Sequence, residues 1–101
     1  MSAARFLVTG GSQGIGAALV ELAAKAGHQV VFTGRNDQFI GAVAKKTGAL
    51  GVKADVSVPA DNARTVDACD THMGGIDVLV NNAAYDYRAD IGGCNTTFNA
   101  Q

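Results

Sequence analysis

Glycines are concentrated between residues 9 and 16, where the chain reads Thr9-Gly10-Gly11-Ser12-Gln13-Gly14-Ile15-Gly16. Glycine adopts positive φ readily and has no Cβ, so the N–H groups of such a turn can approach an anion closely. The apolar residues that follow have helical spacing, and the positive end of a helix dipole favours the same anion. The segment therefore predicts a phosphate-binding turn, whose expected ligand is the pyrophosphate of a dinucleotide.

The spacing of these glycines is T-G-x-x-x-G-x-G, whereas the commonest dinucleotide fingerprint is G-x-G-x-x-G. Three further polar signals follow, namely Arg35, the pair Asp55-Val56, and the pair Asn81-Asn82. Each has a structural alternative: a tight turn for the glycines, a solvated charge for Arg35, a turn cap for Asp55, and backbone partners for the two asparagines. The agreement of the four signals favours a nucleotide site.

The elements that must position these residues alternate between strand and helix. Short apolar runs predict strands at 5–9, 29–33, 49–55 and 76–81, and periodic segments predict helices at 14–26, 37–47 and 60–73. Alternation of this kind requires right-handed crossovers and a parallel sheet. We expect an α/β, Rossmann-like sheet of strand order 3-2-1-4 with flanking helices, and a nucleotide at the carboxyl ends of the strands.

Two details of the helices can be predicted. Ser57 and Pro59 suit the start of the third helix, because serine can cap free N–H groups and proline lacks the donor that the first turn cannot use. The first helix should turn one apolar face to the sheet, consisting of Ile15, Leu19, Leu22, Ala23 and Ala26.

Composition narrows the classes of function. The chain has 101 residues, 48% of them hydrophobic, and a net charge of −1, which favours one small domain without a basic surface for nucleic acid or anionic lipid. No apolar run approaches the length of a membrane span, and no secretory signal is recognisable, so we expect a cytoplasmic protein with no membrane or nucleic-acid partner. Cys69 and Cys94 lack metal-ligand spacing with His28 and His72, so no metal site is expected.

About the first 84 residues resemble the short-chain dehydrogenase/reductase family. In that family the glycine motif binds the dinucleotide, a pair like Asp55-Val56 contacts the adenine, and a segment like 81–84 lies beside the adenosine ribose; Ala84 departs from the family's glycine. The cofactor-binding residues that the resemblance implies are Thr9, Gly10, Ser12, Gln13, Gly14, Ile15, Gly16, Arg35, Asp55, Val56, Asn81, Asn82 and Ala83.

The end of the second predicted strand indicates which dinucleotide is bound. A carboxylate there would accept from the ribose 2′-OH of NAD, but the sequence reads Thr33-Gly34-Arg35. A guanidinium can pair bidentately with a 2′-phosphate. NADP(H) is therefore favoured over NAD(H).

The resemblance also implies a catalytic Ser and a Tyr-x-x-x-Lys pair after the fourth strand. No serine follows Ser57 and no lysine follows Lys53, so neither Tyr85 nor Tyr87 has the required lysine. We therefore expect no catalytic residues here, and interpret residues 1–84 as an NAD(P)-binding half-domain truncated after strand four and 85–101 as an irregular tail. The chain would be the NADP(H)-binding portion of an oxidoreductase acting on carbonyl or alcohol substrates, not catalytic by itself. One alternative is a non-catalytic dinucleotide sensor or interaction module, and another is an inert structural or assembly fragment that no longer binds a nucleotide.

The fourth strand, carrying Val78, Leu79 and Val80, would be an uncovered edge without a fifth strand beside it. Such an edge exposes unpaired backbone groups and apolar side chains. We therefore expect a homo-oligomer built through the fourth strand and the third helix, or else poor solubility.

Overall fold

The computed structural model describes residues 3–82, which form seven elements. Their order is β1 (Arg5–Thr9), α1 (Gly14–Lys25), β2 (Gln29–Gly34), α2 (Asp37–Thr47), β3 (Leu50–Lys53), α3 (Pro59–Met73) and β4 (Val78–Asn81). The predicted elements are all present, with bounds that differ by up to two residues. The predicted tail, 85–101, and the site residue Ala83 lie outside the described residues.

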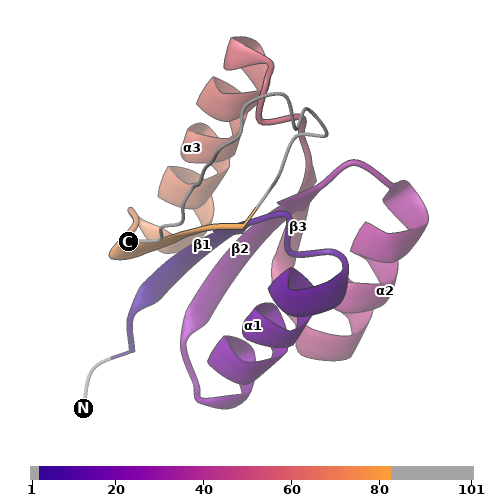
Figure 1. Ribbon diagram of the computed structural model, residues 1–101. Helices are drawn as coiled ribbons and strands as arrows, with labels where there is room; N and C mark the ends of the chain where they lie inside the picture. The colour runs from indigo at the N-terminus through magenta and orange to yellow at the C-terminus, as the bar shows by residue number, and fades with distance from the viewer. Residues whose placement is uncertain (1–2, 83–101) are drawn as a thin grey trace, which may run out of the picture.

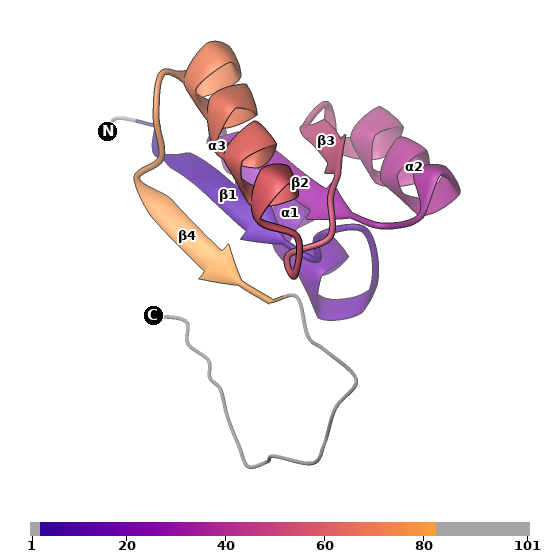
Figure 2. The same ribbon diagram turned by 90° about the horizontal axis from the view of Figure 1, so that it is seen from above.

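The four strands form one parallel sheet of order β3-β2-β1-β4, as predicted. Leu7 at the centre of β1 is in register with Val31 on β2 and Leu79 on β4. The turn after β1 and the end of β4 therefore meet at the carboxyl edge of the sheet, in the Rossmann-like arrangement. Figure 2 shows β4 at the open edge beside β1, where α3 does not cover it.

Helices cover both faces of the sheet. α1 and α2 lie on one face and α3 lies on the other (Figure 1). Successive strand residues point to opposite faces, so Leu7 packs with Cys69 on the α3 side, whereas Val8 packs with Val20 on the α1 side. Two thin apolar cores thus hold the helices against a central sheet.

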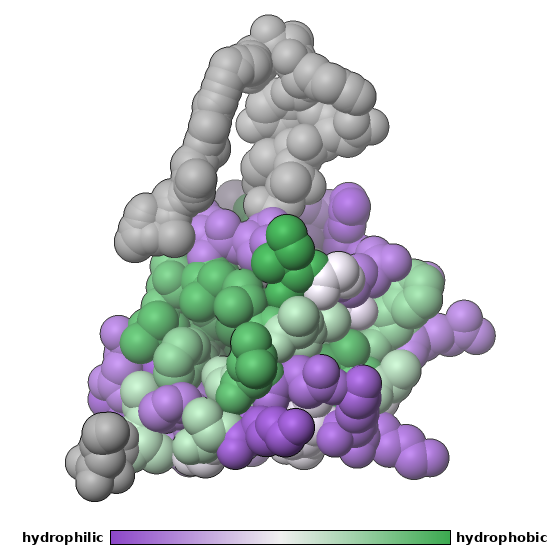
Figure 3. All heavy atoms as spheres, turned by 60° about the horizontal axis from the view of Figure 1, so that its bottom comes forward, coloured by the Kyte–Doolittle hydropathy of each residue, from purple (hydrophilic) through white to green (hydrophobic). Residues whose placement is uncertain are grey.

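The apolar face predicted for α1 is largely wrong. The side chains of Ile15 and Leu22 are 75% and 65% exposed, while Gly16 and Val20 are buried and Ala23 packs against the core. The buried side of α1 instead carries Gly16, where a Cβ would overlap the carbonyl oxygen of Gly10, so this packing requires a glycine. Figure 3, from the side of α1 and α2, shows strongly apolar side chains exposed on this face.

The predicted start of α3 is half right. Pro59 occupies the first turn as expected, but the residue at the N-cap is Val58, and no side chain caps the helix. Ser57 instead donates its N–H and its hydroxyl to Oδ1 of Asp55, at 2.9 and 2.6 Å. An ionised carboxylate is a stronger acceptor than a neutral group, and it holds the serine away from the helix.

No helix within residues 3–82 combines the length and the apolar character that crossing a bilayer requires.

Candidate nucleotide-binding site

A pocket of about 650 Å³ opens at the carboxyl edge of the sheet. Four segments contribute to it: the turn after β1, the end of β2 with the start of α2, the loop after β3, and the residue after β4. The lining residues are Gly10, Ser12, Gln13, Thr33, Gly34, Arg35, Asn36, Phe39, Ala54, Asp55, Val56 and Asn82. All four predicted signals therefore reach one pocket.

β2 holds the first part of the glycine turn in place. The N–H of Gly10 donates to Oγ1 of Thr33 at 3.2 Å, and the N–H of Gly11 donates to the carbonyl oxygen of Thr33 at 2.8 Å. Gly10 and Gly14 have φ angles of 69° and 55°, which L side chains rarely adopt. The conformational need for glycine at these two positions is therefore confirmed.

The second part of the turn leaves its donors free. Within the described residues, the N–H groups of residues 12–16 donate to no protein acceptor, and the N-cap of α1, Gln13, makes no side-chain capping bond. In α2, by contrast, the side chain of Asn36 accepts from the N–H of Phe39 at 3.1 Å. An uncapped N-terminus with free N–H groups and a positive dipole end suits an anion.

Two glycines, Gly16 on α1 and Gly34 on β2, allow these elements to pack closely against the glycine turn. A Cβ built on Gly16 would overlap the carbonyl oxygen of Gly10 and lie 2.6 Å from Nδ2 of Asn82. Similarly, a Cβ on Gly34 would overlap the hydroxyl of Ser12. Side chains at these positions would push α1 or the turn out of place, so the residues present fit a diphosphate at the start of α1.

Arg35 lies at the rim of the pocket, directly after β2. Within residues 3–82, its exposed guanidinium forms no hydrogen bond and no salt bridge. The nearest acidic residue in sequence, Asp37, forms a salt bridge of 3.4 Å with Lys53 and does not line the pocket. The guanidinium is therefore free to pair with an anionic group of a ligand.

Asp55 follows β3, and its carboxylate is already engaged. The hydrogen bonds from the Ser57 hydroxyl and N–H lower the pKa of Asp55, with a smaller contribution from the charge of Arg35. The bond to an N–H two residues later is an Asx turn. This is the structural alternative considered above, and it leaves the other carboxylate oxygen, Oδ2, without a bond in the described residues.

Asn81 ends β4 and Asn82 follows it, next to the glycine turn. Nδ2 of Asn82 donates to the carbonyl oxygen of Gly10 at 3.1 Å, and its N–H donates to Oγ1 of Thr9. That same hydroxyl donates to Oδ1 of Asn81 at 3.1 Å. These residues fasten the turn to β4, so Asn82 both lines the pocket and satisfies backbone groups.

The predicted site residues thus divide into two sets. Seven line the pocket: Gly10, Ser12, Gln13, Arg35, Asp55, Val56 and Asn82. Five others, Thr9, Gly14, Ile15, Gly16 and Asn81, do not line it; they shape the turn or the strand ends, and the Ile15 side chain is largely exposed.

Sequence reasoning missed five lining residues: Thr33, Gly34, Asn36, Phe39 and Ala54. Asn36 stands just before a predicted helix, which is a capping signal that could have located it. Thr33 could have been found only from its pairing with the turn. Among the described residues, no cluster of His, Cys, Asp or Glu side chains could hold a metal ion.

Comparisons with known proteins agree with this geometry. The family model described as short chain dehydrogenase matches residues 4–98. Gluconate 5-dehydrogenase from Gluconobacter oxydans is 38% identical over 96 residues, covering 90% of this chain and 38% of that protein. A putative ketoacyl reductase of granaticin polyketide synthase from Streptomyces violaceoruber is 44% identical over 79 residues, covering 76% of this chain and 32% of that protein.

A crystal structure of a short chain dehydrogenase from Bacillus anthracis superposes with a TM-score of 0.76 at 32% identity, covering 80% of this chain and 35% of that one. The chain therefore spans between about a third and two fifths of the length of these relatives. Use of an NAD(P) dinucleotide is implied by the family. The match over nearly the whole chain, the sheet order and the glycine turn lead to one conclusion: the chain belongs to the short-chain dehydrogenase/reductase family.

Proposed function

We propose that this chain is the dinucleotide-binding portion of a short-chain oxidoreductase and that it binds NADP(H) in preference to NAD(H). The observation that carries the proposal is the pocket itself, in which the uncapped start of α1 and the unpaired guanidinium of Arg35 line one continuous surface. The pyrophosphate would lie at the N–H groups of residues 12–16, and the adenine would lie beside Asp55 and Val56.

The preference for NADP(H) rests on the charges at the end of β2. An acidic residue that accepts from a ribose 2′-OH would repel a 2′-phosphate, and here the neighbouring acid, Asp37, is paired with Lys53 instead. Arg35 supplies up to two parallel N–H donors to a phosphate. Because this site is exposed, we expect its contribution to affinity to be about tenfold, at the lower end for hydrogen bonds to charged groups.

The test is a fluorescence titration of the chain with NADPH and, separately, with NADH. Arg35→Ala should weaken NADPH binding about tenfold and leave NADH binding unchanged, because only NADPH carries the 2′-phosphate. Lys45→Ala is the matched control, since Lys45 is an exposed cation near the end of α2 that does not line the pocket. Equal losses for both dinucleotides, or none for NADPH, would refute the assigned role of Arg35.

We propose that the chemical step, a hydride exchange with a carbonyl or alcohol substrate, requires residues that this chain does not contain. The dinucleotide supplies the hydride when bound; the residues described here would bind and orient it. The competing proposal is a dinucleotide sensor or interaction module. Binding without turnover, together with a partner whose capture depends on the glycine turn, would favour the sensor.

Assembly through β4 also stays a proposal. Leu79 and Val78 are 53% and 36% exposed at the open edge, and Val66 on α3 is 47% exposed, which supports association through this side. A well-folded monomer in sedimentation at micromolar concentration would count against a homo-oligomer.

The cytoplasmic location and the division at residue 84 remain proposals as well, and the family match runs past that division to residue 98.

A further inference from the structure

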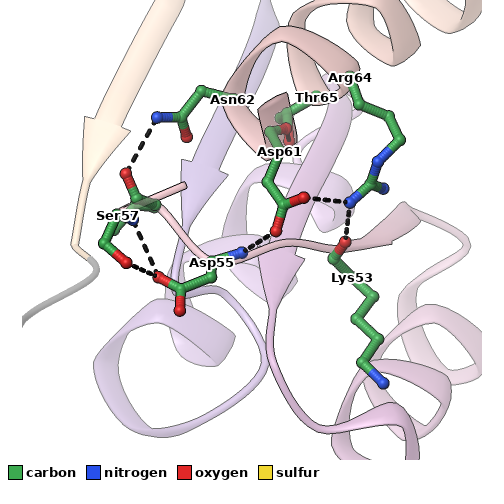
Figure 4. A network of polar contacts seen from close by, with 8 residues as sticks. Lys53, Asp55, Ser57, Asp61, Asn62, Arg64 and Thr65 are labelled. Carbon is green, nitrogen blue, oxygen red and sulfur yellow. Dashed lines mark hydrogen bonds and ion pairs between the residues drawn. The ribbon is translucent and has the colours of Figure 1, made fainter. Parts of the chain in front are cut away.

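We propose that Asp61, on α3, is a positioning residue that holds the segment Asp55-Val56 in the shape the adenine end of the ligand requires. The inference rests on the proposed function, because it concerns the same pocket. Asp61 does not line that pocket, and no sequence motif points to it. Its importance follows from the polar contacts between α3 and the loop after β3 (Figure 4).

Asp61 connects the loop to α3 through both of its carboxylate oxygens. Oδ2 accepts from the backbone N–H of Asp55 at 2.9 Å, and Oδ1 accepts from the guanidinium of Arg64 at 3.0 Å. The same guanidinium nitrogen donates to the carbonyl oxygen of Lys53 at 2.8 Å. Figure 4 shows the Asp61 carboxylate between the Asp55 backbone and Arg64.

Asp55 is the first residue after β3 whose N–H does not bond to the neighbouring strand β2. The preceding N–H, of Ala54, still donates to the carbonyl oxygen of Gly34 on β2 at 2.9 Å. For Asp55 the acceptor comes from a side chain six positions later instead of from a strand. Asp55 and Val56 both line the pocket. The Asp61 carboxylate therefore helps to set their backbone direction, together with the bond from the N–H of Val58 to the carbonyl oxygen of Asp55 at 2.9 Å.

A second contact holds the other end of the segment. Nδ2 of Asn62 donates to the carbonyl oxygen of Val56 at 2.9 Å. The segment is therefore tied to the first turn of α3 at both of its residues. Hydrogen bonds from Asp55 and Arg64 also lower the pKa of Asp61, so its carboxylate is ionised at neutral pH and both oxygens remain acceptors.

The experiment compares three variants of the whole chain, Asp61→Ala, Asp61→Asn and Asp67→Ala. Asparagine keeps one oxygen that can accept from the N–H of Asp55 but offers no acceptor to Arg64, while alanine loses both bonds. Both variants lose the negative charge near the start of α3. Asp67 is an exposed acid on the same helix with no hydrogen bond or salt bridge in the described residues. Each protein is titrated with 5′-AMP, which probes the adenine end, and with inorganic pyrophosphate, which probes the turn before α1.

We expect Asp61→Ala to weaken 5′-AMP binding about fivefold, the effect of losing one hydrogen bond. Pyrophosphate binding should change less than about twofold, and Asp61→Asn and Asp67→Ala should bind 5′-AMP like the unaltered chain. Amide hydrogen exchange, measured without ligand, should speed up at Asp55 in Asp61→Ala but not in Asp61→Asn.

Equal losses in the alanine and asparagine variants would overturn the inference, because they would show an effect of charge on the helix alone. Unchanged exchange at Asp55 in Asp61→Ala would also overturn it. If the unaltered chain binds neither 5′-AMP nor pyrophosphate, the proposed function fails and the positioning role with it. If the unaltered chain binds both probes and Asp61→Ala binds 5′-AMP with the same affinity as the unaltered chain, only the positioning role fails.

Discussion

The packing of Gly16 against the glycine turn gives a sharp prediction. A Cβ at this position would overlap the carbonyl oxygen of Gly10 and lie 2.9 Å from its carbonyl carbon. Because these are backbone atoms, no change of rotamer can relieve the overlap, and α1 must move away from the turn. We therefore expect Gly16→Ala to destabilise the fold and to weaken NADPH binding.

The magnitude follows from two opposing effects. Overpacking costs about 1–3 kcal/mol, and the rigid neighbours here place Gly16→Ala near the upper value. Alanine in a helix is favoured over glycine by up to about 1 kcal/mol. The expected net loss of unfolding free energy is therefore about 2 kcal/mol.

Gly41→Ala is the matched control, because it adds the same methyl group to a helix. Gly41 lies exposed inside α2, and a Cβ there would have no neighbour within 4 Å. Gly41→Ala should raise the free energy of unfolding by about 0.5–1 kcal/mol through helix propensity alone. Urea unfolding followed by circular dichroism would measure both variants. A Gly16→Ala chain as stable as Gly41→Ala, with unchanged NADPH affinity, would refute the packing of α1 on the turn.

Three more outcomes follow from single contacts. Thr33→Val removes the buried acceptor for the N–H of Gly10 and leaves that donor unsatisfied, so it should lower the free energy of unfolding by about 1–3 kcal/mol. An unchanged midpoint in urea unfolding would contradict this. Asn36→Ala removes the cap of α2 and should lower the unfolding free energy by about 1 kcal/mol; a gain in stability would show that the cap is unimportant. Hydrogen bonds from Arg5 lower the pKa of Asp77 to about 2, so its carboxylate contributes stability above pH about 4 that is lost as pH falls toward 2. The stability difference between the unaltered chain and Asp77→Asn should shrink over that range, and a difference independent of pH would contradict the assignment.

Local patterns were sufficient for the elements and their order. The apolar run in β2, from Val30 to Phe32, is buried on both faces of the sheet, as a central parallel strand requires. The strand order then followed from general rules of connection, which leave few arrangements for alternating strands and helices. The glycine turn was recognisable because positive φ and close approach restrict the residue type.

Orientation within those elements could not be predicted. α1 has apolar residues on more than one side, and periodicity alone chose a face that includes the exposed Ile15 and Leu22. In the structure the side of α1 that carries Gly16 and Val20 is buried, and a Cβ on Gly16 would overlap the carbonyl oxygen of Gly10. Ser57 gives a second example. Its position before the third helix predicts a cap, but its N–H and hydroxyl donate to the ionised Asp55, a competing acceptor that spacing does not reveal.

The amino-acid sequence alone determined that strands and helices alternate, that a glycine-rich turn follows the first strand, and that an arginine instead of an acid follows the second. These features depend on residue type and spacing, which act over a few neighbouring positions. The tertiary structure decided which donors remain free for a ligand and which are used internally. It also brought Thr33 to the N–H of Gly10 and Asp61 to the N–H of Asp55, because each side chain meets its partner only when separate elements pack together.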